Sequence, residues 1–475
     1  MASATTLVDF SACELREELS HRRVSAREVV EAHLSRIEAL NPRLNAIVTL
    51  DADQARTAAA AADEAQAKGR ELGSLHGLPI VHKDLFVTAG MRTTFGSQVF
   101  ADHVPTETAL IVQRERAAGA ISLGKTNTPE LGAGSQTFNE VFGATANPYA
   151  QDRTCGGSSG GSAVALAAGM APLADDSDLG GSLRNPASFC NVVGLRPTPG
   201  RVPRWPTPAP RFPFNVHGPM ARTVADTALL FDAIAGPDPR APLSGRWPAA
   251  PLSGRLERNL TDVRVAWSQT LGGLPMEPAV LNALAPVRSL LEELGCVTED
   301  AEPDLSGADE VFVVWRAWYF ELAFGDLLDR HRHQLKDTVV WNIEAGRALT
   351  GPQLGTAERL RAALDERCRQ FQEQFEFLVL PVCQVVPFAI DQPYVTRINE
   401  VALDTYLDWM KSCYRISVTG LPAASVPAGF TPDGLPVGLQ VVGRPGDELG
   451  TLQLAHAIEQ ATNASRRRPV LESSP

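Results

Sequence analysis

Residues 153–174 read RTCGGSSGGSAVALAAGMAPLA, and residues 177–186 read SDLGGSLRNP. The first Gly/Ser run leads directly into a segment of small apolar residues from Ala163 onward, so it is anchored to an element and is not a flexible linker. Glycines permit positive φ, and successive main-chain N–H groups in such a turn can converge on an oxyanion. The two runs therefore predict an acyl-transfer site, with a serine at the end of a turn as the acyl acceptor.

A serine hydroxyl is a poor nucleophile unless a base takes its proton. The sequence allows two arrangements of a base beside the serine. One is Ser–His–Asp, with His82, His103 or His217 as the base. The other uses Lys83, which ends the apolar stretch GLPIVHK (77–83). A surface ion pair between Lys83 and Asp84 is the ordinary alternative, but the apolar approach favours burial, which lowers the pKa of a lysine.

Two other chemistries are disfavoured by their context. GAISLGKT (119–126) satisfies the phosphate-loop pattern. However, a helix is expected before it and an apolar strand inside it, the reverse of what phosphate binding requires. For a metal site, His331 and His333 are two residues apart, which places them on different sides of a helix. We therefore expect no metal and no cofactor.

The composition bounds the class of protein. The 475 residues are 44% hydrophobic and 21% charged, which is enough for a large core. A net charge of -12 argues against nucleic-acid binding, which needs clustered cations. No apolar run approaches the ~18 residues of a membrane span, and acidic residues interrupt the N-terminus where a secretory signal would be apolar. The seven cysteines lack zinc-like spacing, so we expect a soluble, reduced, cytoplasmic protein, with Cys155 and Cys190 as packed side chains.

The secondary structure that the sequence predicts changes along the chain. The first seventy-odd residues predict helices, with capping boxes at Ser11–Glu14 and Ser25–Glu28 and a helix end at Asn41–Pro42. Residues 77–236 predict layered strands and helices, and residues 260–414 predict helices. Strands and loops are expected again from 416–420 to residue 443, followed by a last helix at 451–461. A sheet completed by the last sixty residues implies one body with an insertion.

Seven segments together resemble the amidase signature family. They cover a little under a third of the chain, in the family's order, and the serine run is a specific signature. The segments are GLPIVHKDLFVTAGMRTTFGS (77–97), LGKTNTPELGAGS (123–135), FGATANPY (142–149), RTCGGSSGGSAVALAAGMAPLA (153–174), SDLGGSLRNPASFCNVVGLRPTPGRVP (177–203), GPMARTVADTALLFDAIAGPDP (218–239) and GLPAASVPAGFTPDGLPVGLQVVGRPGDE (420–448).

The resemblance implies an α/β fold, with a large twisted mixed β-sheet covered by helices on both faces. We expect residues 1–75 to form an N-terminal helical segment packed on the core. Residues 76–475 would form a single amidase signature domain, with a variable, helix-rich, substrate-binding insert at about 240–415.

The resemblance also implies a Ser–cis-Ser–Lys triad with a non-proline cis bond before its bridging serine. Asp178 and Arg184 match signature positions and are expected to brace the loop. The implied residues are Lys83 as base, Ser158 as bridging serine after Gly157, Ser182 as nucleophile, and the main-chain N–H groups of Leu179, Gly180, Gly181 and Ser182 as the oxyanion hole.

The chain departs from the family pattern beside these positions. Asp175 and Asp176 stand where small or neutral residues are usual, and His82 and Cys155 also differ. The two carboxylates either raise the pKa of Lys83 and disfavour anionic substrates or are solvated at a strand start. We expect the second.

The resemblance implies hydrolysis of amide C–N bonds through an acyl-enzyme on Ser182, with a small-molecule amide or carbamate and water as partners and no membrane partner. Carbamate or ester hydrolysis on the same triad, the A subunit of a glutamyl-tRNA amidotransferase and a non-catalytic binding protein are the alternatives. Oligomeric state is open between monomer and homodimer. The loop 134–141 and the insert are expected to select the substrate, and the insert's aromatic residues favour an apolar or aryl group: Trp315, Trp318, Tyr319, Phe320, Phe324, Trp341, Tyr406 and Trp409.

Overall fold

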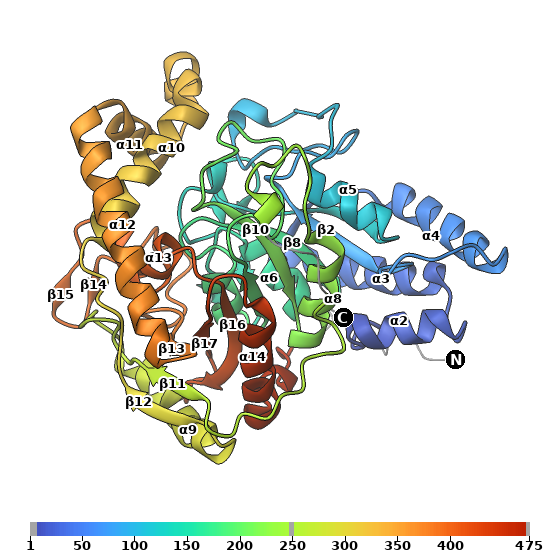
Figure 1. The fold of residues 1–475 in the computed structure, drawn as a ribbon. Coiled ribbons are helices and arrows are strands. Elements are labelled where there is room, and N and C mark those ends of the chain that lie inside the picture. The colour runs from blue at the N-terminus through green and yellow to red at the C-terminus, as the bar shows by residue number, and fades with distance from the viewer. Residues whose placement is uncertain (1–6, 247–250, 472–475) are drawn as a thin grey trace.

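A mixed sheet of eleven strands organises the computed structural model, which describes residues 7–246 and 251–471 (Figure 1). Strand β2 pairs in parallel with both β3 and β8, whereas β10 pairs antiparallel with β8 and β9. The predicted mixed α/β sheet is thus confirmed. From one edge to the other the strands are β1 (Ile47–Leu50), β3 (Ile121–Thr126), β2 (Pro79–Lys83), β8 (Leu173–Asp178), β10 (Val216–Ala221), β9 (Val193–Arg196), β16 (Ala423–Phe430), β17 (Pro436–Val442), β13 (Phe377–Pro381), β11 (Arg264–Trp267) and β12 (Val297–Asp300).

Helices cover both faces of this sheet. Gly438 of β17 faces Ser188 in helix α7 (Arg184–Phe189), and Gly429 of β16 faces Ala283 in α9 (Pro278–Glu293). Gly429 pairs with Val437, so these two residues lie on the same face of the sheet. Successive residues of a strand lie on opposite faces, so Gly438 lies on the other face. Helices α7 and α9 therefore pack on opposite faces of the sheet. Helix α6 (Gly160–Ala167) contacts α7, and α8 (Val224–Ile234) and α14 (Glu448–Thr462) are in contact with each other, with α14 also contacting α9.

The N-terminal residues form α2 (Ala12–Ser20), α3 (Ala26–Leu44) and α4 (Ala52–Ala67). Both predicted capping boxes are present. The expected helix end at Asn41–Pro42 is wrong: α3 continues to Leu44, where Asn45 adopts a left-handed conformation with φ 49°. Pro42 has no N–H to donate to the carbonyl of residue 38, but the helix continues past it, because the N–H of Asn45 donates to Asn41 O at 2.7 Å. The segment also supplies an edge strand, β1, which pairs antiparallel with β3.

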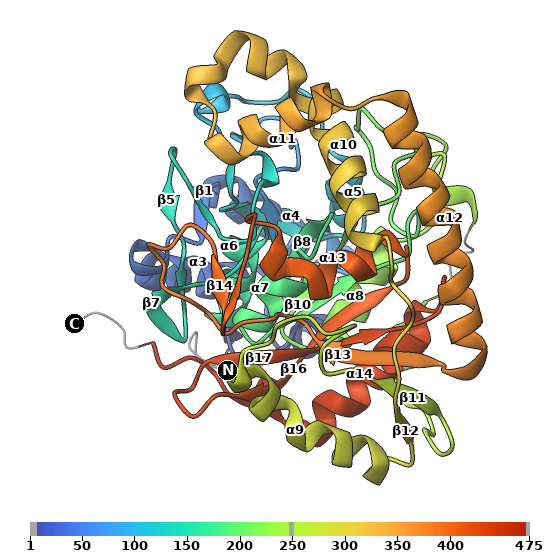
Figure 2. The ribbon, with the colours of Figure 1, turned by 90° about the vertical axis from the view of Figure 1, so that its left-hand side faces the viewer.

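The region 240–415 contributes strands as well as helices. It provides β11, β12 and β13, which complete one end of the sheet. Its helices α10 (Ala308–His331), α11 (Asp337–Arg347) and α12 (Gly351–Gln374) stand together at one side of the molecule (Figures 1 and 2). Residues 416–418, predicted as a strand, belong instead to α13 (Lys411–Val418). The β-branched side chains suggested a strand locally, but their buried packing against the rest of the chain decides the conformation.

Shorter elements complete the fold. Helix α5 (Leu110–Ala117) precedes β3, so the phosphate-loop pattern forms a core strand, as predicted. No helix in the described ranges combines the length and the apolar content needed to cross a bilayer. The other strands in the described part of the chain form three two-stranded ribbons: β4 (Phe138–Asn139) with β5 (Gly143–Ala144), β6 (Ala146–Asn147) with β7 (Ala150–Thr154), and β14 (Arg397–Ile398) with β15 (Val401–Ala402).

Candidate active site

Lys83 is the last residue of β2 and is fully buried between β3 and β8. Its Nζ lies 2.8 Å from Ser158 Oγ and 2.8 Å from Ser159 Oγ, and 3.4 Å from Ser177 Oγ. Asp84, the alternative ion-pair partner, instead accepts hydrogen bonds from the main chain and the hydroxyl of Thr94. The strand therefore delivers Lys83 into a cluster of serines inside the protein.

Ser158 lies in a tight turn between β7 and α6. A cis peptide bond joins Gly157 to Ser158, as the family resemblance implied. The main-chain carbonyl of Gly157 accepts a hydrogen bond from Ser135 Oγ at 2.8 Å. A Cβ at Gly161 would lie 2.3 Å from the main-chain nitrogen of Asn127, so only glycine lets α6 begin this close to the neighbouring chain.

The acidic residues beside Lys83 are buried, which corrects the expectation that they are solvated. Asp175 and Asp176 are both 0% exposed, because β8 is an inner strand of the sheet. Asp176 Oδ1 lies 4.0 Å from Lys83 Nζ. Burial lowers the pKa of Lys83 from 10.5 to about 8, while the negative charge of Asp176 opposes that fall. Burial likewise raises the pKa of Asp176 to about 8.

Asp175 belongs to a second buried cluster behind Lys83. Its Oδ2 lies 2.6 Å from His82 Nδ1, and its Oδ1 accepts a hydrogen bond from the main-chain N–H of Lys83 at 3.1 Å. His82, Asp175 and Glu115 are the only described residues whose ligand atoms are grouped closely enough to hold a metal ion. Burial, followed by the charge of Asp175, raises the pKa of Glu115 well above its usual value. His82 and Asp175 are hydrogen-bonded to each other, whereas Glu115 Oε2 lies 3.4 Å from His82 Nδ1 and forms no hydrogen bond among the described residues.

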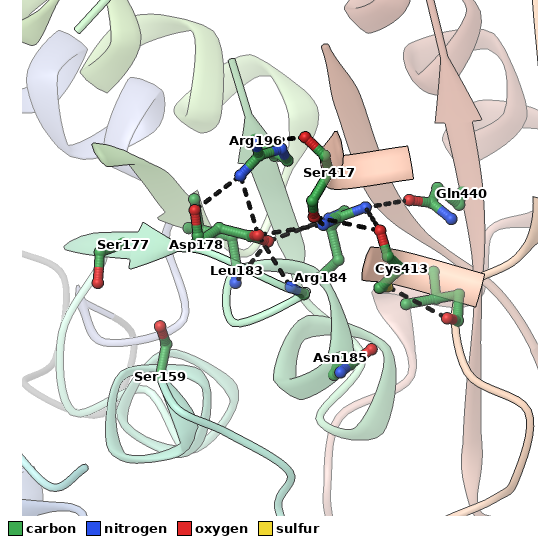
Figure 3. Close-up of polar contacts among 12 residues, drawn as sticks. Ser159, Ser177, Asp178, Leu183, Arg184, Asn185, Arg196, Cys413, Ser417 and Gln440 are labelled. Carbon is green, nitrogen blue, oxygen red and sulfur yellow. Dashed lines mark hydrogen bonds and ion pairs between the residues drawn. The ribbon is translucent and has the colours of Figure 1, made fainter. Parts of the chain in front are cut away.

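The loop after β8 is held by buried ion pairs, drawn in Figure 3. Asp178 contacts Arg184 Nε at 3.0 Å and Arg196 Nη1 at 3.2 Å. Burial alone would raise the pKa of the Asp178 carboxyl, but the two guanidinium groups hold it well below its usual range. Arg184 also donates to Cys413 O at 3.0 Å and to Ser417 Oγ at 2.6 Å, one helical turn apart in α13. The expected bracing pair is therefore part of a larger network that includes Arg196, a residue the motif analysis missed.

The main-chain amides of this loop are not equivalent. The N–H of Gly181 donates to Asp178 Oδ1 at 2.9 Å, so it braces the loop. In the described part of the chain, no protein acceptor forms a hydrogen bond with the N–H of Gly180 or Ser182. These two amides are available to a bound oxyanion, whereas that of Gly181 is engaged.

Ser182 opens onto a cavity of about 400 Å³ that Ser158 and Ser177 also line. Of the eight aromatic residues predicted to face the substrate, only Tyr319, Phe320 and Phe324 line this cavity. Trp409, for example, is fully buried and stacks on Phe189. The loop 134–141 does not line the cavity; instead, Ser135 supports the serine turn. The first half of the chain contributes three further aromatic residues to the cavity that no sequence motif indicated: Phe86, Phe95 and Trp205.

The candidate histidine bases do not form a Ser–His–Asp arrangement. Only His217 lines the cavity with Ser182. Its Nδ1 is buried without a hydrogen-bond partner in the described residues, so no carboxylate orients the ring. Burial lowers the pKa of His217 well below its usual value. His82 is committed to Asp175, and His103 lies at the surface. Cys155 and Cys190 are buried, and burial raises the pKa of both thiols, as expected for packed side chains.

Known proteins resemble this chain over nearly its whole length. The family model described as Amidase matches residues 28–452. An acylamidase of Rhodococcus erythropolis is 36% identical over 464 residues, covering 97% of each chain. The A subunit of the glutamyl-tRNA(Gln) amidotransferase of Moorella thermoacetica is also 36% identical, over 97% of this chain and 98% of that one. The crystal structure of a bacterial aryl acylamidase of the amidase signature family superposes with a TM-score of 0.90 at 27% identity, covering 97% of this chain and 99% of the other.

Proposed function

This chain belongs to the amidase family, and from that premise we propose that it hydrolyses linear amide C–N bonds of apolar or aryl substrates through an acyl-enzyme on Ser182. The observation that carries the proposal is the 2.8 Å contact between the buried Lys83 Nζ and Ser158 Oγ, beside the cavity that Ser158 and Ser182 share. In this proposal Lys83 is the base behind the cavity wall, Ser158 is the bridging hydroxyl that contacts it, and Ser182 is the nucleophile, which lines the same cavity as Ser158.

In this mechanism Lys83 acts in its neutral form. With a pKa of about 8, roughly a tenth of the lysine is neutral at pH 7, and the fraction rises with pH. Neutral Lys83 accepts the Ser158 proton while Ser158 accepts the Ser182 proton, because a hydroxyl donates and accepts at once. Ser182 Oγ then attacks the substrate carbonyl carbon.

The resulting oxyanion is stabilised by main-chain donors. We assign this role to the amides of Gly180 and Ser182, together with that of Leu179, which the family resemblance implies, and leave out that of Gly181, which donates to Asp178. One such donor contributes about 3–4 kcal/mol to the transition state in other acyl-transfer enzymes. Ser158 next protonates the leaving nitrogen as the C–N bond breaks. Water hydrolyses the acyl-enzyme by the same relay in reverse.

Active-site labelling tests the nucleophile. A fluorophosphonate should form one covalent adduct on Ser182, located by mass spectrometry, and Ser182→Ala should lose both the adduct and amide turnover. Heat-denatured protein is the control for reactivity that does not depend on the fold. Labelling at another serine, or turnover by Ser182→Ala near the native rate, would contradict the assignment. The absence of any labelling or turnover would favour a non-catalytic binding protein.

The A subunit of a glutamyl-tRNA amidotransferase is the second candidate, because the Moorella relative is as similar in sequence as the acylamidase. The acidic side chains of Asp175 and Asp176 do not line the cavity, so their charge does not argue against this candidate. The cavity nevertheless fits an amide that carries an α-ammonium group poorly. No carboxylate among the described lining residues is available to pair with the α-ammonium group.

A substrate panel separates the reaction classes. Comparing kcat/KM for anilides, primary amides, carbamates and glutamine shows which acyl group is preferred on the same triad. We expect anilides to rank first, because aromatic side chains line the cavity.

A further inference from the structure

The substrate cavity contains a buried arginine that has no acidic partner among the described residues. Arg316 of α10 lines the cavity and is 5% exposed. Its Nε donates to Asn342 Oδ1 at 3.1 Å and its Nη2 donates to Tyr406 Oη at 2.7 Å, so both partners are neutral. Within the described ranges, no carboxylate lies within ion-pair distance of it, and its Nη1 makes no hydrogen bond. Buried charges in proteins are usually paired, so this guanidinium lacks an anion.

Arg316 is held in place by its surroundings. The guanidinium carbon lies 4.4 Å from the centroid of Phe320, which also lines the cavity. The two hydrogen bonds and the stacked ring fix the plane of the guanidinium without neutralising its charge. A planar guanidinium with free N–H groups matches the geometry of a carboxylate.

Arg204 adds a second unpaired guanidinium to the same cavity. It lies in the loop between β9 and β10 and donates to Phe212 O at 3.3 Å and to Thr207 Oγ1 at 3.2 Å. Its Nε is buried and has no hydrogen-bond partner in the part of the chain that the structure describes. It also forms no ion pair there. The cavity therefore carries two arginines from elements far apart in sequence.

The rest of the lining has no opposing charge. Asp and Glu are absent from the described residues around the cavity, and His217 is kept neutral by burial. Asp175 and Asp176, which could have repelled an anion, lie within the core behind Lys83. The other lining residues are mostly aromatic or aliphatic.

We propose that the physiological substrate is an amide with an apolar or aryl body and one carboxylate, which Arg316 binds with the help of Arg204. This proposal rests on the proposed amidase function and narrows its substrate class to amides with a net negative charge. A zwitterionic substrate is disfavoured, because the cavity provides cations for a carboxylate but no anion for an ammonium.

Matched substrates test this with the native enzyme. 4-Acetamidobenzoate and 4-nitroacetanilide have the same shape, but only the first is charged. Succinic acid monoanilide and 3-nitropropionanilide form the corresponding pair with the charge on the acyl side. We expect kcat/KM to favour the carboxylate at least tenfold in one of the two pairs, which also shows whether the amine or the acyl part contacts the arginines. No preference for the carboxylate in either pair would overturn the proposal.

Arginine variants test whether Arg316 and Arg204 cause the preference for carboxylate substrates. Arg316→Met should reduce the carboxylate-to-nitro ratio at least tenfold, Arg204→Met should reduce it less, and Arg316→Lys should keep part of it. Arg211→Met, which removes one surface charge from the loop that carries Arg204, should leave the ratio unchanged. An unchanged ratio in both Arg316→Met and Arg204→Met would also overturn the proposal.

A binding measurement separates this proposal from the proposed function. In Ser182→Ala, calorimetric titration should show 4-acetamidobenzoate binding at least tenfold tighter than 4-nitroacetanilide. If native protein hydrolyses neutral anilides as fast as their carboxylates, amidase function stands and the anion site fails. If native protein hydrolyses no amide but Ser182→Ala binds the carboxylate selectively, the anion site stands and the proposed function fails. Equal binding of both ligands overturns the anion site.

Discussion

Replacing Asp176 by asparagine should shift the pH dependence of the enzyme to lower pH. Asp176 Oδ1 lies 4.0 Å from Lys83 Nζ, and both groups are fully buried. Its negative charge favours the protonated lysine, which cannot act as the base. Asparagine keeps the shape of the side chain and can still accept the 3.3 Å hydrogen bond from Ser162, but it carries no charge.

The size of the shift follows from the distance. Two unit charges 4 Å apart interact by about 4 kcal/mol at an effective dielectric constant of about 20. That energy corresponds to a change of at most ~3 units in the pKa of Lys83. Because burial raises the pKa of Asp176 to about 8, this carboxyl is about nine-tenths protonated at pH 7, and the realised change in the pKa of Lys83 is smaller than this limit. We expect the pKa of Lys83 to fall from about 8 by about 1–2 units.

The sign of the effect on activity follows directly. A lysine whose pKa is about 8 is roughly one-tenth neutral at pH 7, and one whose pKa is about 6–7 is half to nine-tenths neutral. The variant should therefore gain about five- to tenfold in kcat/KM at pH 7 and little or nothing above pH 9. In the native enzyme, kcat/KM should rise with pH through about 8.

The assay is kcat/KM for an anilide from pH 6 to 10, with thermal unfolding to confirm that the variant is folded. Asp391→Asn, at an exposed position, is the control for a change of one unit in net charge. A folded Asp176→Asn enzyme whose rising limb stays near pH 8, or moves higher, would refute the electrostatic coupling of Asp176 to Lys83.

Three further changes probe the rest of the site. Ser158→Ala should lower kcat by at least ~100-fold while retaining measurable turnover, because the relay loses its bridging hydroxyl but not its base; native kcat in a stopped assay would argue against the bridge. Arg196→Met should lower the free energy of unfolding by about 3–5 kcal/mol in urea titration, because it removes one buried partner of Asp178 and leaves the charge of this carboxylate partly uncompensated. A decrease below about 1 kcal/mol would contradict this account of the loop. Gly161→Ala should cost at least ~1–3 kcal/mol and reduce activity in parallel, since its Cβ would lie 2.3 Å from Asn127 N; a stable, fully active variant would show that α6 can move aside.

Much of the fold and the site is predictable from local pattern. A few consecutive residues are enough to predict the two Gly/Ser turns, the apolar strand that ends at Lys83 and the N-terminal capping boxes. The structure contains all of these features. The phosphate-loop match could be dismissed for the same reason, because the order of helix and strand around it was already evident. The division into a helical segment at 1–75 and one domain at 76–475 stays a prediction.

Other features depend on partners far away in the sequence. In the sequence, Asp175 and Asp176 resemble the solvated start of a strand. In the structure they are buried, because β8 lies between β2 and β10 in the sheet. Arg196 has no motif of its own, and its role appears only when Asp178, 18 residues earlier, lies against it. Ile416 and Val418 have β-branched side chains, yet residues 416–418 fold as part of a helix. This helix brings Cys413 and Ser417 to Arg184.

The sequence by itself thus determined the family, the nature of the sheet and the candidate chemical groups, because those signals lie in short segments whose backbone geometry follows from glycine, serine and apolar spacing. Only the tertiary structure decided the environment of each group: which carboxylate faces Lys83, which amide is free beside Ser182, and which arginines enter the cavity. Burial and electrostatic pairing are properties of the space between elements, and the neighbours that fill this space come from all parts of the chain.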